Sequence, residues 1–197
     1  MLNLDIQTII QDLEKNLDEK RFAHTLGVAY TAACLAMRYD YDMNKAYLAG
    51  LLHDCAKCLS DEKRISICEK RNMFISRVER KNPSLLHAKV GSIIAMEEYD
   101  IDDMDIIQAI MNHTTGRPGM SALEKIIFVA DYMEPGRNKA KNLELIREMA
   151  FKDLDETLFK ILEDTLVYLE ESEDEIDDMT KKTFDYYKGI RESEEKV

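Results

Sequence analysis

The sequence has little glycine or proline, few cysteines and no long apolar run. No apolar stretch approaches the ~20 residues that a membrane-spanning helix needs, so we expect no membrane partner. The N-terminus has no basic stretch followed by an apolar segment, which argues against a secretory signal. Without such a signal, four cysteines indicate reduced thiols in a cytoplasmic protein. These are Cys34, Cys55, Cys58 and Cys68.

Basic residues are in deficit, with 27 Lys and Arg against 39 Asp and Glu and a formal net charge of −12. A surface this negative repels nucleic-acid backbones, so a DNA- or RNA-binding protein is disfavoured. A small phosphorylated substrate remains compatible if bound cations or a few local Lys and Arg side chains offset the charge.

Seven Gly and three Pro leave few points at which a helix must end, and the segments between them carry apolar residues at helical spacing. Ser121 with Glu124 three residues later is a capping-box pattern that begins one helix, and Pro135 ends it. Residues 126–130 could form a short strand, but their flanks favour helix. The sequence predicts an all-α protein with helices at about 4–17, 22–39, 45–57, 84–99, 102–112, 121–134, 143–151, 155–168 and 179–191, and a shorter one after Ser60.

The chain has only four histidines, and each alone is more often a core or surface residue than a metal ligand. Two aspartates change this interpretation. Asp54 directly follows His53 beside an apolar pair, and Asp131 interrupts an apolar run. Such placement is costly unless a metal or an ion partner compensates. The other three histidines are His24, His87 and His113.

Four His and two Asp are more ligands than one structural zinc site uses, and four-coordinate zinc sites usually include cysteine. Mixed imidazole and carboxylate ligands suit iron or manganese in octahedral or two-metal centres. The alternative is that the six residues are unrelated.

The Cys55-x-x-Cys58 spacing has no second pair and is interpreted as coincidence, with cysteine packing as a small hydrophobic residue.

These residues, in this order, resemble the ligand pattern of the HD-domain phosphohydrolases. The resemblance is closer to the YqeK family, the bacterial symmetrical diadenosine-tetraphosphate hydrolases, through residues 21–25 (RFAHT), 49–57 (AGLLHDCAK), 86–88 (LHA), 112–116 (NHTTG) and 130–137 (ADYMEPGR). The chain departs from the family after Arg137, where an aromatic-Pro-Gly turn is replaced by residues 138–142. It also lacks a proline that is common before the last helix, around residues 176–179.

The resemblance implies one HD-domain helical bundle over residues 1–197, with the metal site between helices. Its core would span about 18–135, and C-terminal helices at 142–195 would pack on it. The implied cofactors are two divalent ions, iron or alternatively manganese. His24, His53, Asp54 and Asp131 would hold one ion, and Asp54, His87 and His113 the other. A metal-bound hydroxide would attack an inner phosphorus of diadenosine tetraphosphate, releasing two ADP.

Asp54, as the bridging ligand, and Lys57, by neutralising phosphoryl charge, are the candidate catalytic residues. Arg21 and Arg137 could bind phosphate bidentately. The segment 114–116 could offer hydroxyl and backbone N–H groups, or simply form a turn. The candidate substrate contacts are Arg21, His24, Lys57, His87, Thr114, Thr115, Gly116 and Arg137.

Two other functions stay open at this point. The first is another HD-type activity, such as a phosphodiesterase, a nucleotidase or a hydrolase of guanosine tetra- or pentaphosphate, because these share the same ligands. The second is a nucleotide- or metal-sensing module without catalysis. The expected partner is a small nucleotide, and a homodimer is possible for the family.

Overall fold

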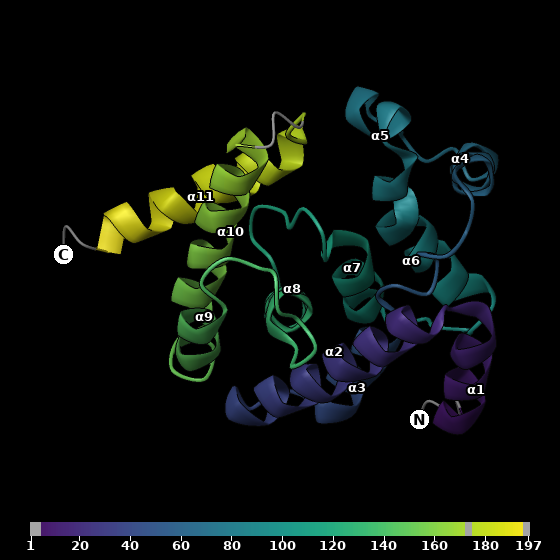
Figure 1. Ribbon diagram of the computed structural model, residues 1–197, viewed down its shortest axis with the longest axis horizontal. Coiled ribbons are helices and arrows are strands. Elements are labelled where there is room, and N and C mark those ends of the chain that lie inside the picture. The colour runs from purple at the N-terminus through teal and green to yellow at the C-terminus, as the bar shows by residue number, and fades with distance from the viewer. Residues whose placement is uncertain (1–4, 172–174, 195–197) are drawn as a thin grey trace.

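The computed structural model describes residues 5–171 and 175–194, and in these ranges it contains helices and no strand. This confirms the predicted all-α class (Figure 1). Leu4 and Glu195, near the ends of the first and last predicted segments, lie outside the described residues. The helices are α1 (Ile6–Asn16), α2 (Glu19–Arg38), α3 (Met43–Leu52), α4 (Asp61–Lys70), α5 (Arg77–Lys81), the 3-10 turn η1 (Pro83–Leu86), α6 (His87–Glu97), α7 (Met104–Asn112), α8 (Ala122–Met133), α9 (Leu143–Met149), α10 (Leu154–Glu171) and α11 (Asp178–Glu194).

Short polar side chains set most helix starts, because their oxygens accept the first backbone N–H groups that have no partner within the helix. The predicted capping box is present: Ser121 accepts the N–H of Glu124, and the Glu124 carboxylate accepts the N–H of Ser121. The helix that follows ends at Met133, two residues before Pro135. The other side-chain N-caps are Asp5, Asp18, Asp42, Ser60, Ser76 and Asp103.

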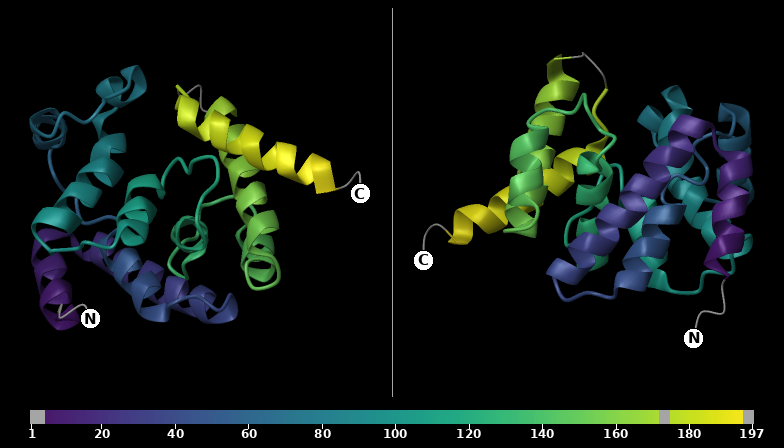
Figure 2. Two further views of the ribbon diagram at one scale, coloured as in Figure 1. Left: turned by 180° about the vertical axis from the view of Figure 1, so that it is seen from behind. Right: turned by 60° about the horizontal axis from the view of Figure 1, so that its bottom comes forward.

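Helix α8 runs through the middle of the molecule, with α2 and α3 on one side, α7 beside it, and α10 on the other side (Figures 1 and 2). Helix α6 packs on α7, and α11 packs on α10. A β-carbon on Gly50 would lie 2.7 Å from the Cα of Ala29, so α2 and α3 approach closely just before His53. Fully buried side chains such as Leu52, Ile110 and Ile127 fill the space between these helices. This packing brings the ends of α3 and α7 and the start of α6 toward the same region.

The third helix ends at Leu52, so the prediction of a helix to Lys57 is wrong. The His53 ring explains the early end, because its Nδ1 lies 2.7 Å from the carbonyl oxygen of Gly50. In a continuing helix, that carbonyl would accept the N–H of Asp54. Residues 53–58 instead form successive turns, and Lys57 donates its N–H to the Asp54 carbonyl at 2.9 Å.

Helix α5 was not predicted, although Ser76 and Glu79 form a second capping box at its start.

The two cysteines of the Cys-x-x-Cys spacing have different surroundings. The Cys55 thiol is buried against the Gly91 carbonyl, and Cys58 is exposed beside Asp18.

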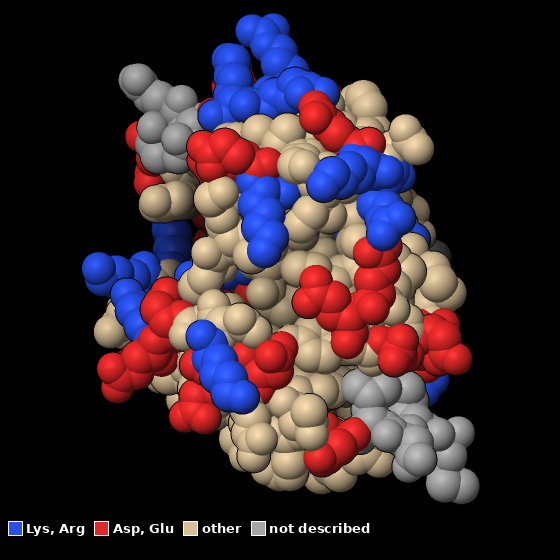
Figure 3. All heavy atoms as spheres, turned by 90° about the vertical axis from the view of Figure 1, so that its right-hand side faces the viewer, with Lys and Arg blue, Asp and Glu red and all other residues tan. Residues whose placement is uncertain are grey.

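Charge is distributed unevenly on the face that Figure 3 shows, with Lys and Arg gathered toward the end that carries α4 and α5 and many of the Asp and Glu side chains below. Acidic partners lie close to these basic side chains. Arg71 pairs with Glu97 at 2.6 Å, and Lys81 pairs with Glu175 at 2.5 Å. Exposed pairs of this kind contribute little to stability.

Among the described residues, no helix is both long and apolar enough to cross a membrane.

Candidate metal centre

The six predicted ligand residues meet at one place between the helices. His24 comes from α2, the His53–Asp54 pair from the turn after α3, His87 from the start of α6, His113 from the end of α7 and Asp131 from α8. Two short distances mark the centre: His24 Nε2 lies 3.0 Å from Asp131 Oδ1, and His87 Nε2 lies 3.1 Å from His113 Nε2. The rings of His53 and His113 have centroids 5.0 Å apart.

Backbone carbonyls orient three of the four imidazole rings in the same way. In each case Nδ1 contacts the carbonyl three residues earlier: Gly50 for His53 at 2.7 Å, Ser84 for His87 at 2.6 Å and Ile110 for His113 at 2.7 Å. A carbonyl oxygen can only accept a hydrogen bond, so Nδ1 carries the proton. The neutral ring then presents an Nε2 lone pair to the centre, as a metal ligand does.

Asp54 divides its two carboxylate oxygens between different histidines. Oδ1 lies 3.2 Å from His87 Nε2 and 3.6 Å from His113 Nε2. Oδ2 lies 3.5 Å from His53 Nε2 and 3.8 Å from His24 Nε2. The side chain is 3% exposed, so bulk water does not reach these oxygens; Arg21 donates to Oδ2 at 2.6 Å, whereas Oδ1 has no hydrogen-bond partner among the residues that the structure describes. This geometry suits a carboxylate that bridges two cations.

Buried polar atoms without hydrogen bonds test whether these residues fit a metal. Within the described ranges, His24 Nε2, His53 Nε2 and Asp54 Oδ1 are buried and have no hydrogen-bond partner. Such atoms cost free energy unless something else satisfies them. Two groups have ligand atoms that all lie within 4.8 Å of one another, namely His24–His53–Asp131 and His53–Asp54–His113. The donor set therefore fits a metal centre.

The protonation states of the ligands also fit, because metals bind neutral imidazole and ionised carboxylate. Burial lowers the pKa of His87 to about 4. Burial opposes ionisation of Asp54, but positive charge on the neighbouring rings, His53 first, holds its pKa well below the usual range, a role that a metal ion would take over once the rings are neutral. Burial also opposes ionisation of Asp131, and the nearby His24 and His53 rings with the Arg137 guanidinium lower its pKa.

Three predicted cationic side chains reach the centre. Arg21 Nη1 lies 2.6 Å from Asp54 Oδ2, and Arg137 Nη2 lies 2.6 Å from Asp131 Oδ1. Lys57 places its Nζ 3.1 Å from His87 Nε2. Burial lowers the pKa of Lys57. The structure thus puts Lys57 beside the ring of a candidate ligand, in the turn rather than on a helix.

The segment 114–116 forms the turn after α7. The N–H of Gly116 is donated to the Asn112 carbonyl at 2.8 Å, and its φ of +64° is in the left-handed region that glycine adopts most readily. The Thr115 hydroxyl is donated to the Gly116 carbonyl at 3.0 Å. Thr114 borders a small cavity together with His113 and Asp131. Substrate contacts from this segment stay a prediction.

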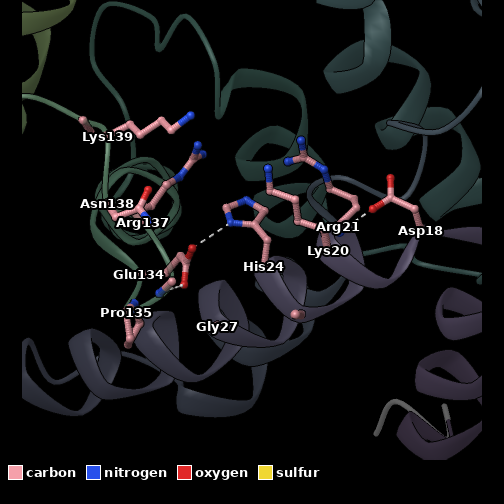
Figure 4. Close-up of a pocket in the computed structure, with 13 residues that line it drawn as sticks. Asp18, Lys20, Arg21, His24, Gly27, Glu134, Pro135, Arg137, Asn138 and Lys139 are labelled. Atoms are coloured by element: carbon pink, nitrogen blue, oxygen red, sulfur yellow. Dashed lines mark hydrogen bonds and ion pairs between the residues drawn. The ribbon is translucent and has the colours of Figure 1, made fainter.

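A cavity of about 790 Å³ opens beside His24, between α2 and the chain that follows α8. Figure 4 shows Lys20 and Arg21 on one side of His24, with Arg137 and Lys139 on the other. Sequence reasoning missed both lysines, although Lys20 adjoins Arg21 and Lys139 lies in the segment that departs from the family pattern. The lining of this cavity therefore carries more basic than acidic side chains, although the protein as a whole is strongly acidic.

Sequence reasoning also missed Glu134, the residue that closes α8. Its Oε1 lies 3.1 Å from His24 Nδ1, and the residue is 3% exposed. A signal was available, because Glu134 follows the candidate ligand Asp131 by three residues and so lies near the same helix face.

Comparisons with known proteins identify the family of this chain. The family model for the HD domain matches residues 21–136. A protein of Bacillus subtilis named symmetrical bis(5'-nucleosyl)-tetraphosphatase is 40% identical over 157 residues, which is 80% of this chain and 83% of that protein. A Staphylococcus aureus protein of the same name is 37% identical, over 88% of this chain and 90% of its own.

A solved structure from Clostridium acetobutylicum, described as a predicted HD superfamily hydrolase involved in NAD metabolism, is 41% identical. It superposes with a TM-score of 0.90 over 93% of this chain and 97% of its own. The matched HD segment contains all six candidate ligands, from His24 to Asp131. The chain therefore belongs to the HD domain family and, within it, to the YqeK group that its motifs resemble.

Proposed function

We propose that this protein is a metal-dependent hydrolase that cleaves diadenosine tetraphosphate symmetrically into two ADP. The observation that carries the proposal is the convergence of imidazole Nε2 lone pairs on Asp54, whose two oxygens face different histidines. The names of the relatives supply the substrate class.

Two divalent ions would be held by this donor set, with iron or manganese suited to mixed imidazole and carboxylate ligands. His24, His53, Asp54 and Asp131 would hold one ion, and Asp54, His87 and His113 the other. Bound metal ions polarise phosphoryl oxygens and lower the pKa of water, which supplies a nucleophile near neutral pH.

The basic side chains around the opening would bind the phosphate chain. Arg21 and Arg137 carry planar guanidinium groups that match phosphoryl oxygens, and each already reaches the centre through one ligand carboxylate. Lys20 and Lys139 line the same cavity and add positive charge. Lys57 would offset charge that develops on the phosphoryl group nearest His87.

A series of adjoining hollows beside His24 and His113 would suit a substrate with a nucleoside at each end. Arg137 lines the large cavity and also a smaller one that contains His113. Thr114 lines that smaller cavity and also a groove of about 970 Å³ between α5–α7 and α10–α11. A tetraphosphate could therefore cross the centre with one nucleoside in the large cavity and the other in the groove.

The experiment measures metal content and early products together. Protein purified without chelator is incubated with diadenosine tetraphosphate in heavy-oxygen water, and the products are resolved by chromatography and mass. Metal near two ions per chain with labelled ADP as the only early product supports the proposal. AMP with ATP would overturn the position of the cleaved bond.

Variants and other substrates separate the remaining possibilities. Asp54→Asn should lose activity and metal together, while Lys63→Ala, at an exposed site in α4, should retain both. Metal without ADP formation, but with turnover of a cyclic nucleotide or guanosine tetraphosphate, would assign a different HD-type activity. Tight nucleotide binding without turnover of any substrate would assign a sensor.

A further inference from the structure

His24 is oriented differently from the other three histidines. Their Nδ1 atoms all contact backbone carbonyls, whereas His24 Nδ1 lies 3.1 Å from the Oε1 atom of Glu134. The reason is location: the other three rings stand at helix ends, but His24 lies within α2, where the carbonyls accept the next helical N–H groups. The ring is instead oriented by a side chain from another element, Glu134 at the end of α8.

The Glu134 carboxylate is itself held in place from several directions. Its Oε2 accepts the N–H of Gly136 at 2.5 Å. A β-carbon on Gly27 would lie 2.5 Å from the same Oε2 atom, so the missing side chain makes room for the carboxylate against α2. Arg147 donates to the carbonyls of Met133, Glu134 and Arg137, at 3.0, 2.9 and 2.9 Å, and so fixes the turn that carries this group.

Asp131 and Glu134 together tie the end of α8 to His24. Asp131 Oδ1 lies 3.0 Å from the Nε2 side of the ring, and Glu134 Oε1 lies 3.1 Å from the Nδ1 side. The ring is therefore held between a candidate ligand and a carboxylate on its outer side. A carboxylate behind a ligating imidazole fixes its tautomer and increases the basicity of the nitrogen that binds the metal.

We propose that Glu134 is a positioning residue that strengthens binding of the metal ion held by His24, His53 and Asp131, and leaves the ion held by His87 and His113 almost unaffected. Neither His87 nor His113 contacts this carboxylate, because their Nδ1 atoms are satisfied by carbonyls of their own segments. The two ions should therefore respond differently to one substitution. This inference rests on the metal centre proposed above.

The test is a titration of metal-stripped protein with Mn²⁺ in an isothermal titration calorimeter. His24→Ala and His113→Ala identify which binding phase belongs to which half of the centre. Glu134→Ala should weaken the His24 phase by roughly 10- to 100-fold and change the other phase by less than about threefold. Glu134→Gln retains an oxygen that can accept from Nδ1 but loses the charge, so its loss should be smaller.

Gly27→Ala tests the same contact without changing Glu134. The added methyl group displaces the carboxylate, so it should weaken the same phase, although alanine is the better residue within a helix. Gly189→Ala in α11, where a β-carbon meets nothing within 4 Å, is the matched control. Glu144→Ala removes an exposed carboxylate from α9 and controls for the loss of charge.

The outcomes separate this inference from the proposed function. Unchanged Mn²⁺ affinity in Glu134→Ala, or equal weakening of both phases, would overturn the inference while leaving the metal centre intact. A parent protein that binds no Mn²⁺ would overturn the metal centre itself. Circular dichroism and thermal melting of each metal-free variant show whether it is folded. If Glu134→Ala does not fold, the Mn²⁺ affinity of the His24 phase in Gly27→Ala tests the inference instead.

Discussion

His87 Nε2 and His113 Nε2 face each other at 3.1 Å, although both rings give their Nδ1 protons to backbone carbonyls. Two neutral rings in these tautomers place two lone pairs against each other. Asp54 Oδ1 adds a negative charge 3.2 Å from His87. A metal cation between these atoms, in addition to the Lys57 ammonium 3.1 Å from His87 Nε2, would turn mutual repulsion into coordination, so metal should stabilise the folded state.

Adding metal should therefore stabilise the fold. At free Mn²⁺ a hundred times its dissociation constant, one site that binds only the folded state adds ~2.7 kcal/mol to the free energy of unfolding. For a chain of this size, that corresponds to a rise in melting temperature of about 5–11 °C. Scanning calorimetry with Mn²⁺ and with excess chelator measures the difference. The shift should shrink in His113→Ala, and equal melting temperatures with and without metal in the parent would contradict the prediction.

Removing a guanidinium from the opening should weaken substrate binding more than metal binding. Arg21→Ala and Arg137→Ala each remove charge-assisted hydrogen bonds worth about 1.5–3 kcal/mol, so kcat/KM should fall by roughly 10- to 100-fold, mainly through KM. Arg38→Ala is the control, because Arg38 lies at the other end of α2 and donates to the Phe151 carbonyl. Steady-state kinetics and metal analysis check both parts. An unchanged KM in both variants would remove these arginines from the substrate site.

Glu124 should matter for stability rather than for chemistry. It is 1% exposed and accepts hydrogen bonds from Arg117 at 2.6 and 2.7 Å and from Asn112 at 2.8 Å, which joins the end of α7 to the start of α8. Glu124→Ala removes a buried acceptor from two partly exposed partners, together with the capping-box bond to the Ser121 N–H, and should lower the free energy of unfolding by about 1–3 kcal/mol. Urea unfolding measures this loss. The exposed Glu144→Ala should lower the free energy of unfolding by less than about 1 kcal/mol. An equally small loss in Glu124→Ala would show that the hydrogen bonds to Glu124 do not stabilise the fold.

Much of this protein could be predicted from local sequence. Apolar spacing predicts the helices because one turn contains 3.6 residues, and Ser121 with Glu124 locates the start of α8 because a capping box involves only neighbouring residues. The end of α3 was misplaced by five residues. Apolar spacing continues past Leu52, but the His53 side chain takes the carbonyl that the next helical N–H would use.

The types of the candidate ligands were visible in the sequence, but their geometry was decided by tertiary packing. The order of four histidines and two aspartates indicates a metal centre, yet no local rule predicts which Asp54 oxygen faces His87 and which faces His53. Glu134 and His24 are 110 residues apart, and they meet only because α8 packs on α2. Hydrogen bonds along a helix follow from its own repeat, whereas contacts between helices depend on how every buried side chain fills the space between them.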